Sequence, residues 1–164
     1  MTMPREDMTV LIMAAGTGGH VFPALSIAQK LREHNVRTEW MGTHQGMENQ
    51  LLEGTGIKIH AVSAKGLKGK GVVRLLFAPF MLVQALIQSM RVLSSVNPDC
   101  VLGMGGFVSG PGGLAAKITG RKLVIHEQNA VPGFTNKLLS KIANLVFEAF
   151  PNTFPSSDKV LYTG

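Results

Sequence analysis

The sequence predicts an α/β fold with a Rossmann-like parallel sheet that is covered by helices on both faces. Short apolar runs alternate along the chain with stretches whose apolar residues recur at helical spacing. The apolar runs are continuous, as at Val10 to Met13, which is typical of parallel strands buried on both sides. Two of these runs lead directly into glycine clusters, so we expect ligands to bind beyond the carboxyl ends of the strands.

Seven strands and five helices are expected in one domain of 164 residues. The predicted strands cover residues 10–13, 38–41, 57–62, 100–102, 123–125, 145–147 and 160–162. The predicted helices cover about residues 21–33, 48–52, 72–96, 111–119 and 135–142. Glycines after the second helix and Pro98 after the third mark helix ends.

Composition restricts the class of partner. The net charge is +6, which suits nucleic acid, an anionic membrane surface or phosphorylated substrates. Only one Trp and one Tyr are present, and no basic residues are interleaved with aromatic ones, so no nucleic-acid partner is expected. The single cysteine, Cys100, lies in an apolar run and is interpreted as a small buried hydrophobe. The early apolar run, residues 8–15, is interpreted as a strand rather than a signal peptide.

The first candidate site is the segment from Ala15 to His20, between the first strand and the first helix. Its glycines allow close backbone approach, and free N–H groups at a helix start attract phosphate. The glycine spacing does not match the dinucleotide-binding fingerprint. His20 is a candidate general base, because the unperturbed pKa of histidine is close to neutrality, but a structural or ligand-contacting role is equally open. A tight strand-to-helix turn is the alternative for the whole segment.

The second candidate site, residues 103–113, occupies the equivalent corner after the fourth strand. Gly105 and Gly106 would form a second phosphate cradle, and Ser109 could donate to a ligand oxygen. Close packing of helix on sheet is the alternative, and it explains Gly112 and Gly113 well.

The third candidate site is His126 to Asn129, directly after the fifth strand. Four consecutive polar side chains at the ligand edge of the sheet could hydrogen-bond sugar hydroxyls. A plain polar loop is the alternative.

The fourth candidate region is an apolar helix with basic residues before it. The apolar run is shorter than a membrane span of about 20 residues, and Arg74 and Gln84 interrupt it. We expect Leu75, Pro79, Leu82 and Leu86 to face the core. A neighbouring apolar stripe with a basic rim would then suit an anionic membrane surface. This membrane site comprises Lys68, Lys70, Arg74, Leu76, Phe80, Val83 and Ile87. A helix that is buried on two sides is the alternative.

Three motifs resemble a known family. Residues 16–25, Gly-Thr-Gly-Gly-His-Val-Phe-Pro-Ala-Leu, and residues 103–113 resemble the two glycine loops of the MurG family of bacterial N-acetylglucosaminyltransferases. His-Glu-Gln-Asn at 126–129, followed by Thr-Asn-Lys at 135–137, resembles its third signature. Their order and spacing agree over nearly the whole chain. The sequence departs from the family pattern at Ala15, where another Gly is usual, and at Phe107, where Tyr is common.

The resemblance implies a GT-B architecture of two Rossmann-like domains, of which residues 1–164 would be the N-terminal, acceptor-binding one. It implies metal-independent, inverting transfer of N-acetylglucosamine from UDP-N-acetylglucosamine to a lipid-linked muramyl-pentapeptide in peptidoglycan synthesis, with no cofactor. The enzyme would be peripheral on the cytoplasmic face of the plasma membrane. By motif match, His20 would be the base and Glu127 a polar residue of the cleft. Thr17, Gly18, Gly19 and Asn129 would reach the donor.

Two other functions can be compared with this one. A non-catalytic membrane-docking subunit of a two-chain transferase would end naturally at Gly164, whereas the family continues there into a second, nucleotide-sugar domain. A nicotinamide-dependent oxidoreductase would need the dinucleotide glycine spacing and an acidic residue after the second strand. Residues 41–43 and their neighbours do not provide that acid.

Overall fold

The computed structural model describes residues 8–63 and 72–164, and it contains the predicted seven-stranded parallel sheet. The strands are β1 (Thr9–Met13), β2 (Arg37–Gly42), β3 (Lys58–Ala61), β4 (Cys100–Gly103), β5 (Lys122–Glu127), β6 (Leu145–Glu148) and β7 (Val160–Tyr162). The helices are α1 (Gly18–Glu33), α2 (Met47–Leu51), α3 (Val72–Val96), α4 (Ser109–Ile118) and α5 (Phe134–Leu139). Each predicted strand and helix is confirmed, with ends that differ by a few residues.

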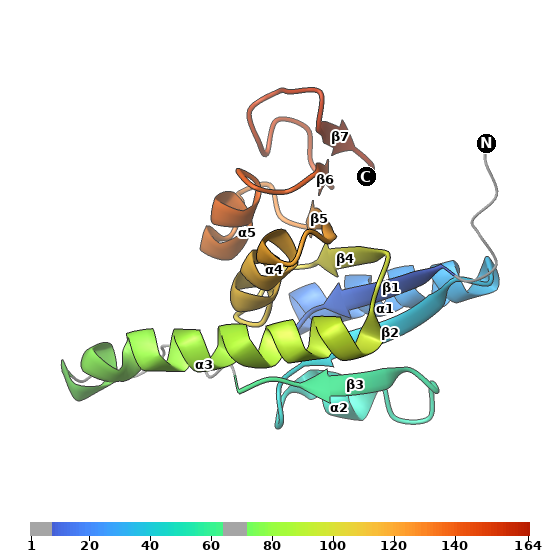
Figure 1. Cartoon of the computed structure of the whole chain (residues 1–164). Helices are drawn as coiled ribbons and strands as arrows, with labels where there is room; N and C mark the ends of the chain where they lie inside the picture. Colours follow the sequence, from blue (N-terminus) through green and yellow to red (C-terminus); the bar gives the residue numbers. More distant parts are fainter. Residues whose placement is uncertain (1–7, 64–71) are drawn as a thin grey trace.

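The strand order is β3-β2-β1-β4-β5-β6-β7, and every neighbouring pair is parallel (Figure 1). The chain moves outward from β1 to β3 and then returns through α3 to β4, on the other side of β1. The order therefore reverses between β1 and β4. In open parallel sheets such a reversal opens a crevice at the carboxyl ends of the two strands, where ligands bind.

Helices cover both faces of the sheet, as the continuous apolar strands predicted. Alternate residues of β1 point to opposite sides. Val10 and Ile12 pack in a core with α1, whereas Leu11 and Met13 pack in a second core with α3, α4 and α5. Because both faces of β1 are covered, the ends of this strand are the parts of it that can reach a ligand.

The core-facing side of α3 differs from the sequence prediction. Pro79 is exposed and Leu82 is 54% exposed, so the predicted stripe is wrong at these two positions, whereas the partly buried Leu86 packs against the core as predicted. The side chain of Leu75 lies outside the described residues. The buried stripe consists of Ala78, Ala85, Ser89 and Leu93. Small side chains allow α3 to pack closely against α4, and several larger apolar residues of α3 remain exposed, namely Phe80, Leu82, Val83 and Ile87.

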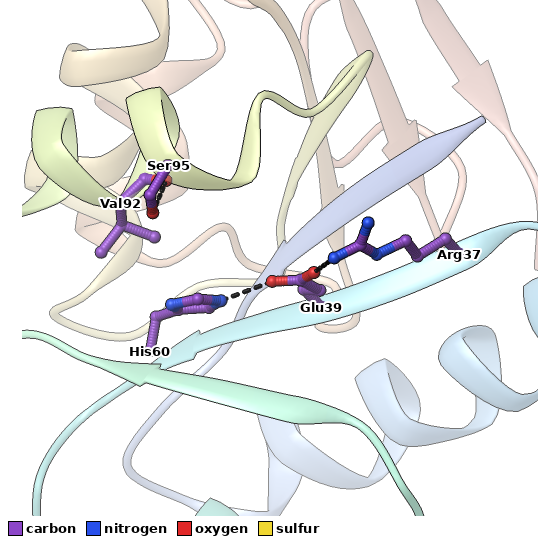
Figure 2. A network of polar contacts seen from close by, with 5 residues as sticks. All are labelled: Arg37, Glu39, His60, Val92 and Ser95. Atoms are coloured by element: carbon purple, nitrogen blue, oxygen red, sulfur yellow. Dashed lines mark hydrogen bonds and ion pairs between the residues drawn. The ribbon is translucent and has the colours of Figure 1, made fainter. Parts of the chain in front are cut away.

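A charged network joins β2 to β3 on the sheet (Figure 2). The buried Glu39 carboxylate accepts hydrogen bonds from the Arg37 guanidinium and from His60 Nε2, the latter at 2.5 Å. Burial is the largest single influence on the pKa of Glu39 and raises it, but the hydrogen bonds from His60 and Arg37 together outweigh burial. The net result is a lowered pKa, so Glu39 remains charged at pH values below those at which a carboxyl group ordinarily becomes protonated.

Candidate functional site

Three segments meet at the carboxyl edge of the sheet, where the strand order reverses. They are the loop after β1, the loop after β4 and the residues that end β5. Met13 is paired with Gly103, and Gly103 is paired with Ile125, so β1 and β4 end side by side and β5 continues for two more residues. The Met104 N–H donates to the Met13 carbonyl at 2.9 Å and holds the two loops together. The first three candidate sites therefore lie at the same edge of the sheet.

The first glycine loop, residues 15–20, is open to solvent. Gly16 has a φ of +101°, a conformation that side chains rarely adopt, and a Cβ atom there would meet nothing within 4 Å. Thr17 and Gly19 are exposed. α1 begins at Gly18, so the N–H groups of Gly18 and Gly19 lie in its first turn and have no partner within the helix. Among the described residues, no side chain caps this helix start, so it remains available to an anionic ligand.

Trp40 supports the first loop from beneath. Its indole is fully buried, and Nε1–H donates to the Ala14 carbonyl at 2.9 Å. Sequence reasoning missed this contact, although a lone Trp in a predicted strand is a signal, because a buried indole N–H needs an acceptor. The hydrogen bond from Trp40 thus fixes the base of the loop.

His20 lies in the first turn of α1, half-buried, and faces the other two segments. Its Nδ1 lies 3.1 Å from Oε1 of Gln128. A Cβ atom at Gly105 would lie 2.8 Å from Cε1 and 2.9 Å from Nδ1 of the ring. The second glycine loop therefore forms one wall against the imidazole, and only glycine fits there.

The second glycine loop is packed against the protein rather than open. A Cβ atom at Gly106 would lie 2.3 Å from the Ala15 carbonyl oxygen. Gly112 and Gly113 allow α4 to approach Met13 and Leu139, with Cβ distances of 2.3 and 2.7 Å to their side chains. Close packing, the alternative considered for Gly112 and Gly113, is therefore confirmed.

The geometry does not support Ser109 as a ligand donor. Its side chain is fully buried, and its hydroxyl lies 3.0 Å from the Met13 carbonyl and 2.7 Å from the Gly105 carbonyl. The hydroxyl oxygen also accepts from the Gly105 N–H at 3.2 Å. Because its donor and acceptor capacity is used within the protein, Ser109 ties the second loop to the end of β1.

Glu127 is also fully buried, and its contacts are internal. Oε1 accepts from the backbone and side-chain N–H groups of Asn129, at 3.1 and 2.8 Å. Oε2 accepts from the Gly133 N–H and from Nδ2 of Asn136, both at 3.0 Å. A carboxylate with four donors has little capacity left for a substrate, so the geometry favours a role in shaping the loop that presents Asn129. Asn129 itself is exposed.

The segment that ends β2 contains no acidic residue, as the sequence indicated, but the carboxylate of Glu48 on α2 reaches it. The Glu48 carboxylate folds back from α2, and its Oε1 accepts from the N–H and hydroxyl of Thr43 at 2.7 and 2.8 Å. Glu48 is fully buried, and Gly46 leaves the room that it occupies. It therefore shapes the turn after β2 rather than presenting a carboxylate to a ligand.

The membrane site is only partly described. Lys68 and Lys70 lie outside the described residues, as do the side chains of Arg74 and Leu76. Phe80, Val83 and Ile87 are 73%, 55% and 45% exposed on α3. Figure 1 shows the N-terminal end of α3 projecting beyond the sheet. In the described part of the chain, no helix is long and apolar enough to cross a membrane.

Comparison with known proteins shows which family this chain resembles. The model of the glycosyltransferase family 28 N-terminal domain matches residues 10–148. The UDP-N-acetylglucosamine--N-acetylmuramyl-(pentapeptide) pyrophosphoryl-undecaprenol N-acetylglucosamine transferase of Ectopseudomonas mendocina is 54% identical over 155 residues. That match covers 94% of this chain and 44% of the relative. The protein of the same name from Acinetobacter baumannii is 52% identical, with 94% of this chain and 42% of the relative covered.

Solved structures show the same relation. The crystal structure of Acinetobacter baumannii MurG superposes with a TM-score of 0.83 at 51% identity, covering 93% of this chain and 44% of that one. UDP-GlcNAc 2-epimerase from Neisseria meningitidis has a TM-score of 0.73 at 21% identity, with 96% and 46% covered, which shows a shared fold alone. The predicted GT-B-type Rossmann fold is confirmed. The chain spans less than half the length of these relatives, and it belongs to glycosyltransferase family 28, whose N-terminal domain it carries.

Proposed function

We propose that this chain is the acceptor-binding half of an enzyme that transfers N-acetylglucosamine from UDP-N-acetylglucosamine to a lipid-linked muramyl-pentapeptide. The observation that carries the proposal is the open first glycine loop, with His20 beside it, at the point where the strand order reverses. Two relatives that match 94% of this chain at 52–54% identity bear the name of that transferase. The helix start at Gly18 and Gly19 would bind phosphate oxygens of the substrates.

His20 is the proposed general base. The acceptor hydroxyl would attack C1 of N-acetylglucosamine, and the bond from C1 to the diphosphate oxygen would break, with the leaving charge on UDP. His20 would take the hydroxyl proton as the new bond forms. A base that is held in place beside the bound hydroxyl also supplies the alignment that such a displacement requires. Asn129, held by Glu127, would contact a sugar or phosphate group from the other side of the crevice.

A chimera provides the direct test of this activity. This chain would be joined to the C-terminal part of the Acinetobacter baumannii relative, and transfer of labelled N-acetylglucosamine to the lipid-linked acceptor would be measured. The matched control is the relative cut and rejoined at the same position. We expect transfer by the chimera and none by this chain alone, because the relatives contain a further half. A folded, inactive chimera beside an active control, or transfer by the chain alone, would contradict the proposal.

We further propose that the outer side of α3 docks this half onto an anionic membrane. The apolar side chains of Phe80, Val83 and Ile87 are exposed there, and the exposed Arg91 follows one turn after Ile87. A shallow depression lined by Ile87, Met90, Arg91, Ser94 and Ser95 continues this surface. A lipid-linked acceptor remains in the bilayer, so the crevice of the enzyme must come to the membrane surface. Exposed apolar side chains beside basic ones suit reversible binding at such an interface.

Vesicle binding distinguishes this proposal from the alternative that protein covers the outer side of α3. Phe80→Glu with Val83→Glu should weaken binding to phosphatidylglycerol-containing vesicles at least about tenfold, because two apolar groups that would each contribute roughly 1.5 kcal/mol or more on burial become charged. Phe22→Glu, which changes a 55% exposed Phe on α1, is the matched control. Absence of binding by the unaltered chain, or equal weakening by the control, would contradict the docking proposal.

A further inference from the structure

We propose that Gln128 is a positioning residue that fixes the tautomer of His20, and that His126 holds Gln128 in the orientation this requires. The inference rests on the proposed function, in which His20 acts as a base. The side-chain amide of Gln128 lies between two imidazoles that come from distant parts of the chain. Its Oε1 lies 3.1 Å from His20 Nδ1, and its Nε2 lies 3.2 Å from His126 Nδ1.

The contacts of the amide nitrogen determine which way the amide faces. Nε2 also lies 3.0 Å from the backbone carbonyl oxygen of His126, which can only accept a hydrogen bond. A reversed amide would set its own oxygen against that carbonyl oxygen, which is repulsive. Nε2 therefore faces His126 and Oε1 faces His20.

The orientation of the amide in turn determines where the proton of His20 lies. An amide oxygen has no hydrogen to donate, so the 3.1 Å contact is a hydrogen bond only if His20 Nδ1 carries the proton. In neutral His20 the lone pair then lies on Nε2. Among the described residues, no hydrogen bond to His20 Nε2 occurs, so this nitrogen is free to accept a proton from a substrate hydroxyl.

Two neighbours keep this arrangement in place. Gly105 packs against the Cε1 and Nδ1 side of the His20 ring, which limits rotation of the imidazole out of line with Gln128. Burial of His126 lowers its pKa, an effect that the nearby Glu127 carboxylate only partly opposes. His126 is therefore neutral at neutral pH, and its Nδ1 can accept the N–H of Gln128. The same principle, a polar neighbour that selects the tautomer of a working histidine, operates in metal sites and in hydrolase triads.

The test measures the tautomer of His20 directly in this chain. The 15N and 1H resonances of the imidazoles distinguish Nδ1–H from Nε2–H, and the chain has five histidines, so His20→Gln and His126→Gln assign the two signals. We expect Nδ1–H for His20 in the unaltered chain. We expect loss of that preference in Gln128→Leu, which removes the acceptor. We expect retention in Gln128→Glu, because one carboxylate oxygen still faces His20, although the second oxygen loses the hydrogen bond to the His126 carbonyl. Gln50→Leu, on the exposed side of α2, is the matched control and should leave the His20 signal unchanged.

The kinetic consequence is measured in the active chimera. Gln128→Leu should lower kcat roughly 10- to 100-fold, the usual cost of losing such a supporting contact. Gln128→Glu should recover much of this loss, and its kcat/KM should rise at higher pH than in the unaltered enzyme, because a carboxylate favours the protonated imidazole.

Two results would overturn the inference, namely a His20 that is Nε2–H in the unaltered chain or a tautomer that is unaffected by folded Gln128→Leu. Failure of the proposed function gives a different pattern. If His20→Ala retains full activity, His20 is not the general base. The hydrogen bond between Gln128 and His20 then has no role in catalysis, even where the resonances show Nδ1–H.

Discussion

The two glycine loops of this chain look alike in sequence but meet different physical requirements. In the first loop, a Cβ atom at Gly16 would meet nothing within 4 Å, and one at Gly19 would meet only the Thr17 hydroxyl at 3.8 Å. In the second loop, a Cβ atom at Gly106 would lie 2.3 Å from a backbone oxygen, and one at Gly112 would lie 2.3 Å from a buried sulfur. Side chains at Gly16 and Gly19 would enter open space, whereas side chains at Gly106 and Gly112 would collide with the protein itself.

This difference shows how one loop supports the other. The second loop fills the space behind the first, with Gly106 against Ala15 and Gly105 against His20. The first loop can therefore leave its N–H groups unoccupied without collapsing onto the sheet. A glycine cluster after a parallel strand is thus evidence of close approach, but the approaching group can be either a ligand or the neighbouring loop.

The largest expected effect is in the second loop, at Gly106. Gly106→Ala would force a side chain into a φ of +79° and against the Ala15 carbonyl oxygen. A strained backbone costs about 1–3 kcal/mol and overpacking about as much again, so we expect a loss of roughly 3–5 kcal/mol in the free energy of unfolding. Urea denaturation measures it. A loss below about 1 kcal/mol would mean that the two loops are not in close contact.

A smaller effect on the free energy of unfolding is expected within α4, where Gly110 and Gly112 differ in the space around them. Gly112→Ala would collide with the buried Met13 side chain and should destabilise the fold by about 1–3 kcal/mol. Gly110→Ala, the matched control, would meet only a Thr135 methyl at 3.7 Å. It should be neutral or stabilise by up to about 1 kcal/mol, because alanine is the better helix former. Equal effects of the two substitutions would contradict the role of close packing.

The pH dependence of stability tests a region away from both loops, namely the charged network around Glu39. The lowered pKa of Glu39 means that its charged network stabilises the fold above the ordinary carboxyl pKa of 4.5, and that this stabilisation is lost as pH falls through the lower folded-state value. Glu39→Gln should therefore flatten the fall in unfolding free energy below about pH 4.5. Glu33→Gln is the control, since Glu33 is fully exposed and its lowered pKa comes mainly from Lys30. A pH dependence that is unchanged in Glu39→Gln would show that the network contributes nothing to stability.

The smallest effect on stability is expected in the first loop. Gly19→Ala should change the free energy of unfolding by no more than about 0.5 kcal/mol, because the new methyl group enters open space in the first turn of α1. The same methyl group would stand where the proposed phosphate binds, so kcat/KM of the chimera should fall. A marked loss of stability with unchanged kcat/KM would reverse the comparison between the loops.

The sequence predicted the elements of the fold better than their contacts. Continuous apolar runs and glycine corners suffice to locate strands such as β1 and β4, because these patterns reflect burial on both faces. The core side of α3 was predicted wrongly because apolarity ranks Leu82 above Ala85, whereas a close helix crossing selects small residues. The spacing of Ala78, Ala85, Ser89 and Leu93 does repeat at the helical period, and it is the signal that would have identified the buried side.

The sequence identified residues of the candidate site but did not predict the role of each one. The sequence predicted that His20, Ser109 and Glu127 lie at or just after the carboxyl ends of strands in one parallel sheet. It could not show that Ser109 and Glu127 turn inward, because burial of a polar side chain depends on partners such as Met13 and Asn136 from other segments. The bridge from His20 to Gln128 joins residues 108 positions apart and is likewise a product of the strand order.

The most direct test of the account is the turnover of the chimera after His20→Ala. In this account the substrates bind at the first loop and His20 is the general base. His20→Ala should therefore lower kcat about 100-fold or more while the free energy of unfolding stays nearly unchanged. His34→Ala, at the exposed far end of α1, is the matched control and should leave kcat unaltered. A rise in the KM for the acceptor with kcat unchanged would make His20 a binding residue. An unchanged kcat/KM in a folded His20→Ala enzyme would contradict the account.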